Sequence, residues 1–343
     1  MNHKERFNAT LERKPVDRPA TWLGMPLSSS LEKMLEYFKV PDLDGLKRLL
    51  DDDLYHVDVP YHSPTADHVA CAFDWTKEGQ SDYEHRTLTT PGFFEDYTDP
   101  SKIDDFEWPD PSKYIKSADC KATVDAVKGD YAIMGALWSC HFQDVCAAFG
   151  MARAFVVMLK HPEMFKAVID RITGFYLEAN EIFLEATAGK LDCVLVGNDF
   201  GGQKGLMLSP RHIRKYALPG SKKIIDQAKS FGVKVIYHSC GSIFDIIPDL
   251  IDLGVDAIHP LQTLARDMEP SRLKREFGTK VSFMGGVDTQ DLLVNGTPEQ
   301  VRANVMALKD IFPTGLVISP SHEALMPDVN PENVKAIFEG FRN

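Results

Sequence analysis

Short hydrophobic runs alternate with longer stretches of helical spacing from about residue 190 to the end of the chain. The runs, which predict β-strands, span residues 193–198, 234–238, 257–261, 281–285 and 315–319. The stretches between and after them, which predict helices, lie near residues 209–231, 243–253, 270–277, 297–311 and 331–342. This alternation is typical of a parallel sheet whose strands are connected by helices.

The N-terminal part supplies three more candidate strands, at residues 20–23, 54–59 and 131–137, each followed by turn or helix signals. Eight strands is the number of a closed barrel, so the sequence predicts an α/β fold of the (β/α)8 type, with residues 1–343 forming a single domain. Residues 139–190 are expected to be helical almost throughout, with Pro162 opening a new helix.

Residues 62–112 interrupt the alternation. Short alternating runs such as Phe73-Asp74-Trp75 and 83–87 are separated by several Pro and Gly residues. No linker or shift in composition flanks the segment, which we expect to be a β-hairpin excursion from the barrel rather than a separate domain.

Composition excludes several classes of partner. Hydrophobic residues make up 44% and charged residues 26%, which is ordinary for a globular protein. The formal net charge of −12 disfavours nucleic acid and anionic lipid as partners, and no apolar run approaches the ~20 residues needed to span a bilayer. The polar N-terminus and the six cysteines suggest a cytoplasmic protein without a disulfide framework.

Polar side chains are predicted at the carboxyl ends of several strands, where barrel enzymes place their active sites. His238-Ser239-Cys240 carries the most weight, because residues i and i+2 of an extended chain point the same way and can meet on one zinc ion. His322 is the preferred third ligand, with Asp199, Asp288 and Glu323 as fallbacks. The alternative is that His238 is a core histidine and Cys240 a small buried filler.

Other candidates have structural explanations of similar or greater weight. Asp199 is either a carboxylate that contacts substrate or a helix N-cap. We expect Cys140 and His141 to be packing residues rather than a nucleophile and its base, because adjacent side chains in a helix or strand face apart. His259 could contact a ligand, and Gly201-Gly202 fits a turn better than a dinucleotide fingerprint.

The segment from Asp199 through Leu261 resembles the uroporphyrinogen decarboxylase superfamily. So do Met284–Asp288, the ending Ser319–His322 with 331–333 after it, and the opening from Arg6 through Pro19, which together span nearly the whole chain. The resemblance implies a single (β/α)8 barrel with its active site in a cleft at the C-terminal rim.

Two branches of that superfamily differ in ways that this sequence distinguishes. The decarboxylases carry an arginine-rich segment after the first strand, whereas this chain reads TWLGMP at 21–26 and has no arginine between Arg18 and Arg48. The chain is more similar to the zinc-dependent, cobalamin-linked methyltransferases, such as the methylcobalamin:coenzyme M methyltransferases. Their HxC motif matches His238 and Cys240, while their usual late cysteine ligand is replaced here by the segment containing His322.

This resemblance implies a methyltransferase that moves a methyl group between a corrinoid and the thiol, ether or amine of a small molecule. His238, Cys240 and His322 would hold zinc, and Asp199 would contact the substrate or the zinc ligands. The corrinoid would come from a separate corrinoid protein, because this chain shows no cobalamin-binding signature. A decarboxylase and a non-catalytic ligand-binding barrel are the alternatives, since a fold alone does not fix a function.

Overall fold

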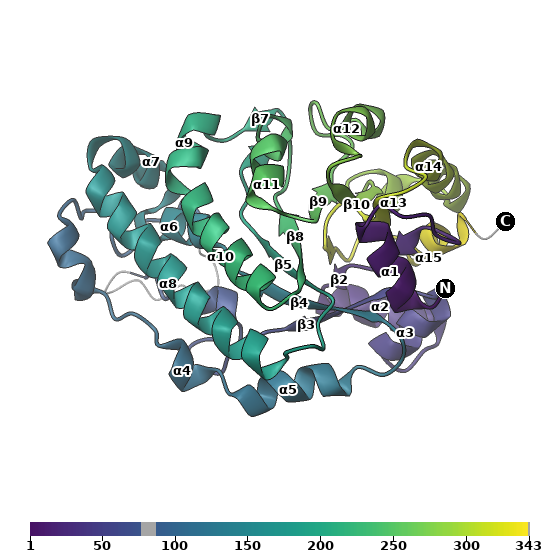
Figure 1. Ribbon diagram of the computed structural model, residues 1–343, viewed down its shortest axis with the longest axis horizontal. Helices are drawn as coiled ribbons and strands as arrows, with labels where there is room; N and C mark the ends of the chain where they lie inside the picture. Colours follow the sequence, from purple (N-terminus) through teal and green to yellow (C-terminus); the bar gives the residue numbers. More distant parts are fainter. Residues whose placement is uncertain (77–86, 342–343) are drawn as a thin grey trace.

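The computed structural model describes residues 1–76 and 87–341 and is organised around one sheet of eight parallel strands (Figure 1). Their spatial order is β1-β11-β10-β9-β8-β5-β4-β3. The strands are β1 (Ala20–Thr21), β3 (Leu54–Asp58), β4 (Ala132–Trp138), β5 (Cys193–Gly197), β8 (Lys234–His238), β9 (Ala257–Leu261), β10 (Ser282–Val287) and β11 (Leu316–Pro320). All eight predicted strands are therefore confirmed, with ends that shift by at most two residues.

The two end strands of the sheet, β1 and β3, close the barrel without a regular ladder. The Asp53 N–H donates to the Thr21 carbonyl at 3.3 Å, and the Thr21 N–H donates to Asp53 Oδ2 at 2.8 Å. These contacts bring the sheet close to a full circle. The fold is a (β/α)8 barrel, as the alternation of strands and helices predicted.

Alternate residues of the strands belong to two separate hydrophobic clusters, because successive side chains of a strand point to opposite faces of the sheet. On β5, Cys193 and Leu195 belong to a small cluster that fills the barrel interior, together with Trp22 and Ile236. Val194 belongs to a much larger cluster formed with the surrounding helices. Both faces of the sheet are buried, which explains why its strands are continuous hydrophobic runs.

Helices connect the strands and cover the outside of the barrel (Figure 1). They are α1 (His3–Leu11), α2 (Ser28–Phe38), α3 (Leu43–Leu50), α4 (Pro111–Tyr114), α5 (Ser117–Ala126), α6 (His141–Phe149), α7 (Met151–Lys160), α8 (Pro162–Ala186), α9 (Pro210–Tyr216), α10 (Leu218–Ser230), α11 (Ile247–Leu253), α12 (Pro270–Phe277), α13 (Leu292–Asn295), α14 (Pro298–Ile311) and α15 (Pro331–Glu339). Pro162 opens α8 as predicted, and Thr297 caps α14 through a capping box with Gln300. Within the described residues no single helix is long and apolar enough to cross a membrane. The pair α6 and α7 reaches that length and apolar composition only when the two helices are counted together, and a 95° bend separates them.

The excursion at 62–112 is present, but its described residues contain no β-hairpin, so that part of the prediction is wrong for them. The segment holds two 3₁₀ helices, Val69–Cys71 and Pro100–Asp105, and one isolated bridge between Pro60 and His68. Prolines that cannot donate to a strand ladder and stacked aromatic rings, such as Phe73 on Trp75 at 4.9 Å, account for the irregular backbone. The second predicted run, 83–87, lies outside the described residues except for its last residue.

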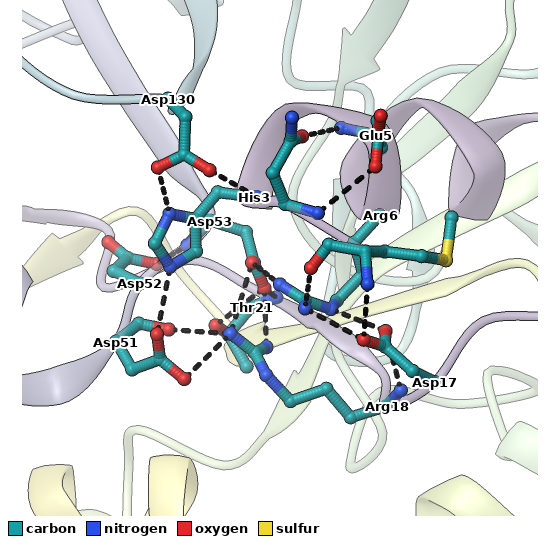
Figure 2. A network of polar contacts seen from close by, with 12 residues as sticks. His3, Glu5, Arg6, Asp17, Arg18, Thr21, Asp51, Asp52, Asp53 and Asp130 are labelled. Atoms are coloured by element: carbon teal, nitrogen blue, oxygen red, sulfur yellow. Dashed lines mark hydrogen bonds and ion pairs between the residues drawn. The ribbon is translucent and has the colours of Figure 1, made fainter.

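A network of ion pairs secures the N-terminal end of the barrel beside the β1–β3 seam (Figure 2). The buried Asp53 carboxylate accepts from Arg6 Nη1 and from Arg18 Nη1, both at 2.6 Å. Arg6 also bonds Asp17, whose pKa is held well below its ordinary value chiefly by this hydrogen bond. The two arginines thereby tie α1 and the start of β1 to the residue that precedes β3.

Candidate active site

The candidate residues lie at the carboxyl ends of adjacent strands. His238 is the last residue of β8, and in the sheet it pairs with Gly197 of β5 on one side and His259 of β9 on the other. Asp199 follows β5 by two residues, and Cys240 follows His238 by two. The strand pairing therefore brings an imidazole, a thiol and a carboxylate to one point of the rim.

Three donor atoms at this point lie within 4.8 Å of one another: His238 Nε2, Cys240 Sγ and Asp199 Oδ1. His238 Nε2 is 3.5 Å from Cys240 Sγ and 3.2 Å from Asp199 Oδ1. In a tetrahedral zinc site with ordinary bond lengths, a nitrogen ligand lies about 3.6 Å from a sulfur ligand and about 3.4 Å from an oxygen ligand. Both distances from His238 Nε2 are thus close to those of a zinc site.

A backbone N–H holds the carboxylate in place, and a side-chain amide holds the thiol. The Cys240 N–H donates to Asp199 Oδ1 at 2.8 Å, and Gln262 Nε2 donates to Cys240 Sγ at 3.6 Å. Burial opposes the charge of Asp199, but its hydrogen bond and charge interaction with His238 outweigh that cost and lower its pKa to about 2. Asp199 is therefore ionised at neutral pH, as a metal ligand needs to be.

The other ring nitrogen of His238 faces a second group of polar side chains. His238 Nδ1 lies 3.4 Å from Glu323 Oε2 and 3.0 Å from His259 Nδ1. Burial, together with the positive charges of His238 and His322, lowers the pKa of His259 well below its ordinary value, so His259 is neutral and can accept a hydrogen bond. A metal-binding histidine commonly donates its second N–H to a neighbouring acceptor. Here His259 Nδ1 is that acceptor, and the Glu323 carboxylate adds negative charge at 3.4 Å.

His238 itself is buried, which opposes its positive charge, yet its pKa is raised well above the ordinary value. The negative charge of Glu323 and the hydrogen bond with Asp199 cause this increase. The imidazole is thus placed between two carboxylates that attract a positive charge. The same field would attract a divalent cation.

His322, the predicted third ligand, lies beside Cys240 but outside the set of three closely spaced donors. Its ring centroid is 6.4 Å from that of His238, and its Nδ1 accepts the Ala324 N–H at 3.0 Å. Hydrogen bonding with Cys240 is the main cause that raises the pKa of His322, which places the imidazole beside the thiol. In this geometry Asp199, rather than His322, completes the set of three closely spaced donors.

The remaining candidates are accounted for by structure. Asp288 accepts the backbone N–H groups of residues 290, 291 and 292 and so caps the short turn after β10. His141 is buried, with Nε2 2.9 Å from the Ala217 carbonyl oxygen, in agreement with a packing role. Gly201-Gly202 forms the short strand β6, which pairs with β7 (Gly205–Leu206) in a hairpin turn.

Close backbone approach explains two glycines beside the site. A Cβ atom on Gly197 would lie 2.1 Å from the His238 carbonyl oxygen. Gly241 has φ +80°, and a Cβ there would lie 2.5 Å from the Gly201 carbonyl carbon. Because neither space admits a side chain, these glycines allow β5 and β8 to bring Asp199, His238 and Cys240 together.

Two contributors were not identified from the sequence. Gln262 was not singled out, because a glutamine after a strand carries no motif of its own. Asp144 in α6 was also missed. A lone acidic residue on a helix is usually solvated, and only the fold shows that this side chain is buried.

The fold and the rim together define a class: a (β/α)8 barrel with ionisable and metal-ligating side chains gathered where its strands end. The chain belongs to the uroporphyrinogen decarboxylase (URO-D) family, whose family model matches residues 66–343.

Curated relatives match more limited segments. The chain is 27% identical over 180 residues to uroporphyrinogen decarboxylase from Pseudoalteromonas translucida, a match that covers 50% of this chain and 46% of the relative. It is 28% identical over 141 residues to methylated-thiol–coenzyme M methyltransferase from Methanosarcina mazei, covering 41% of this chain and 35% of the relative. These matches span less than half the length of the relatives.

A solved structure extends the similarity to the whole fold. A methyltransferase from Methanosarcina mazei superposes with a TM-score of 0.71, covering 99% of this chain and 98% of the other at 16% sequence identity. At that identity the superposition supports the barrel architecture alone.

Proposed function

We propose that this protein is a zinc-dependent methyltransferase that moves a methyl group between a corrinoid and a thiol, ether or amine of a small molecule. The observation that carries the proposal is the cluster of His238 Nε2, Cys240 Sγ and Asp199 Oδ1 at the barrel rim. The methyltransferases among its curated relatives support the reaction class.

The donor set favours zinc over other common divalent ions. Imidazole and thiolate are ligands that Zn²⁺ accepts together, whereas Mg²⁺ and Ca²⁺ prefer sets made only of oxygen atoms. Three protein ligands are typical of a catalytic zinc site, which keeps a fourth position for substrate. His238, Cys240 and Asp199 would hold the ion, and the adjacent His322 is the alternative third ligand that the sequence predicts.

When bound, zinc would supply Lewis acidity, either by lowering the pKa of an acceptor thiol or by polarising the heteroatom that carries the methyl group. The protein side chains contribute orientation. His259 holds the His238 ring through Nδ1, with the Glu323 carboxylate 3.4 Å away, which leaves Nε2 directed at the cluster. Trp138 lies edge-on to the His238 ring, with 5.8 Å between the ring centroids, and packs against it.

The distribution of arginine favours methyl transfer over decarboxylation of a polycarboxylate. A substrate with several carboxylates needs charge-assisted partners such as arginine. Arg18, the last arginine before the first strand, bonds Asp51 and Asp53 at the opposite end of the barrel from the cluster. The segment 21–26 that follows contains no basic residue.

The rim offers a surface for a corrinoid-carrying protein. Exposed apolar side chains stand on loops that follow four different strands on the same side of the barrel as the cluster. They are Leu27, Met207, Leu264 and Met326. Binding there would bring the corrinoid over the proposed zinc site.

Metal content tests the proposal directly. We expect close to one zinc per chain in the purified protein and strongly reduced zinc in Cys240→Ala, measured by elemental analysis. Cys71→Ala is the matched control, because it removes a thiol that is not part of the cluster. Unchanged zinc in Cys240→Ala would exclude the assignment, and methylcobalamin turnover that persists in fully metal-free protein would exclude the zinc-dependent reaction.

A further inference from the structure

A cavity of about 490 Å³ adjoins the barrel rim between the segment after β3 and the first turns of α6. Cys71, Phe73, Trp75, Leu88 and Ala147 form most of its wall. The only charged side chain among the described residues that line it is Asp144. The size and the largely apolar wall are typical of a small-molecule site.

Asp144 is a buried acid whose partners are neutral. Its side chain lies in the first turn of α6, the residue is 8% exposed, and Tyr176 Oη donates to Oδ2 at 2.6 Å. Among the described residues its side-chain hydrogen-bond partner is this neutral tyrosine, and no lysine, arginine or histidine forms an ion pair with it. Burial raises the pKa of Asp144 to about 7, against the opposing effect of the Tyr176 hydrogen bond. Buried carboxylates usually have a cationic partner, and here the position for one faces the cavity.

Trp75 contributes a second polar group to the same wall. Its ring is stacked between Phe73 at 4.9 Å and Phe106 at 4.8 Å, so both of its faces are covered and only its edge is left to the cavity. A hydrogen-bonding interaction with the Trp75 indole lowers the pKa of Asp144, so the indole N–H lies near the carboxylate. Yet this buried N–H has no hydrogen-bond partner of good geometry among the described residues. Recognition in this cavity therefore depends on the carboxylate and not on a cation above an aromatic face.

Cys140 is influenced both by the acid of the cavity and by carboxylates of the rim. It precedes α6, where its carbonyl accepts the Asp144 N–H at 2.9 Å. Burial raises the pKa of the Cys140 thiol, and so do the negative charges of Asp144, Asp199 and Glu323. The cavity acid and two rim carboxylates therefore act on the same thiol, and α6 begins at the end of the barrel that holds the proposed zinc site.

We propose that the cavity binds the substrate of the methyl transfer as an organic cation, a protonated amine on an apolar body, with Asp144 as its counter-ion. This inference rests on the proposed function and specifies its substrate class. A protonated amine forms a charge-assisted hydrogen bond with a buried carboxylate, which is roughly twice as strong as a neutral one. An anionic substrate would be repelled by Asp144 and would find no basic side chain among the described lining residues.

Three probes of similar shape test the charge preference: benzylamine, benzyl alcohol and benzoate, each titrated calorimetrically into the full chain at about pH 8, above the pKa of Asp144. We expect benzylamine to bind at least about tenfold more tightly than benzyl alcohol and benzoate not to bind. Binding of benzoate as tight as that of benzylamine would overturn the proposal.

Variants locate the binding site. Asp144→Asn should weaken benzylamine binding by at least about tenfold, whereas Asp170→Asn, which removes an exposed acid on α8, should leave it unchanged. Ala147→Leu, which fills the cavity and leaves Asp144 in place, should abolish binding of benzylamine and benzyl alcohol. Unchanged benzylamine affinity in a folded Asp144→Asn or Ala147→Leu protein would refute the site.

Zinc analysis of the same samples separates this inference from the proposed function. Asp144→Asn should keep the zinc content of the unmodified protein, because Asp144 is not one of the three donors at the rim. A protein that binds zinc through Cys240 but shows no preference for benzylamine would refute only the substrate class. A protein without zinc that still binds benzylamine through Asp144 would refute the metal assignment and retain the cation site.

Discussion

The Asp199→Asn substitution preserves the size of the side chain but removes the negative charge that lies 3.2 Å from His238 Nε2. If Asp199 is the third zinc ligand, the variant keeps the nitrogen and sulfur donors and loses the anionic oxygen. Structural zinc sites with four ligands bind with about 10–16 kcal/mol, or about 3 kcal/mol for each ligand. We therefore expect zinc affinity to fall about a hundredfold.

Competition with a chromogenic chelator measures this loss. His322→Ala is the matched comparison, because His322 lies beside Cys240 but outside the group of three closely spaced donors. We expect the loss in His322→Ala to be less than about tenfold. The reverse order, with a large loss in His322→Ala and little change in Asp199→Asn, would refute the geometric assignment and support the ligand set predicted from the sequence.

Three further predictions concern the support of the site and the stability of the barrel. Glu323→Gln removes the carboxylate behind His238 and should weaken zinc binding about 10- to 100-fold in the same chelator assay; an unchanged affinity would contradict the orienting role. Asp53→Asn leaves the Arg6 guanidinium without its buried anion. This should lower the free energy of unfolding, measured in urea titrations, by about 3–5 kcal/mol. A loss below about 1 kcal/mol would show that the ion-pair network contributes little to stability. Burial opposes protonation of His3, but its hydrogen bonds with two aspartates raise its pKa in the folded protein above 6.5. The protonated side chain therefore stabilises the fold fully below pH 6.5, and this stabilisation is lost as the pH rises through the pKa of the folded state. In urea titrations at several pH values, this part of the pH dependence should disappear in His3→Gln.

The sequence predicted the barrel well because its signals are local. β8, β9 and α12 begin and end where the hydrophobic runs and the proline signals place them, since burial on both faces makes each strand a continuous apolar run. The excursion after β3 was predicted less well. There, contacts such as Phe73 on Trp75 decide the backbone, and aromatic spacing along the chain resembles that of a strand.

Residue chemistry alone selected His238 and Cys240, because their spacing of two on an extended chain places both side chains on one side. The order of the strands in the sheet determined which residues lie beside His238 and Cys240. β5 lies next to β8, so Asp199 faces His238, whereas His322 follows β11, which is three strands away from β8. Likewise only tertiary packing buries Asp144 against Tyr176 and gives a plain acidic residue an unusual pKa. Ligand type and local spacing are properties of the chain, whereas distances between distant residues and the desolvation of a charge arise only when the fold brings the elements together.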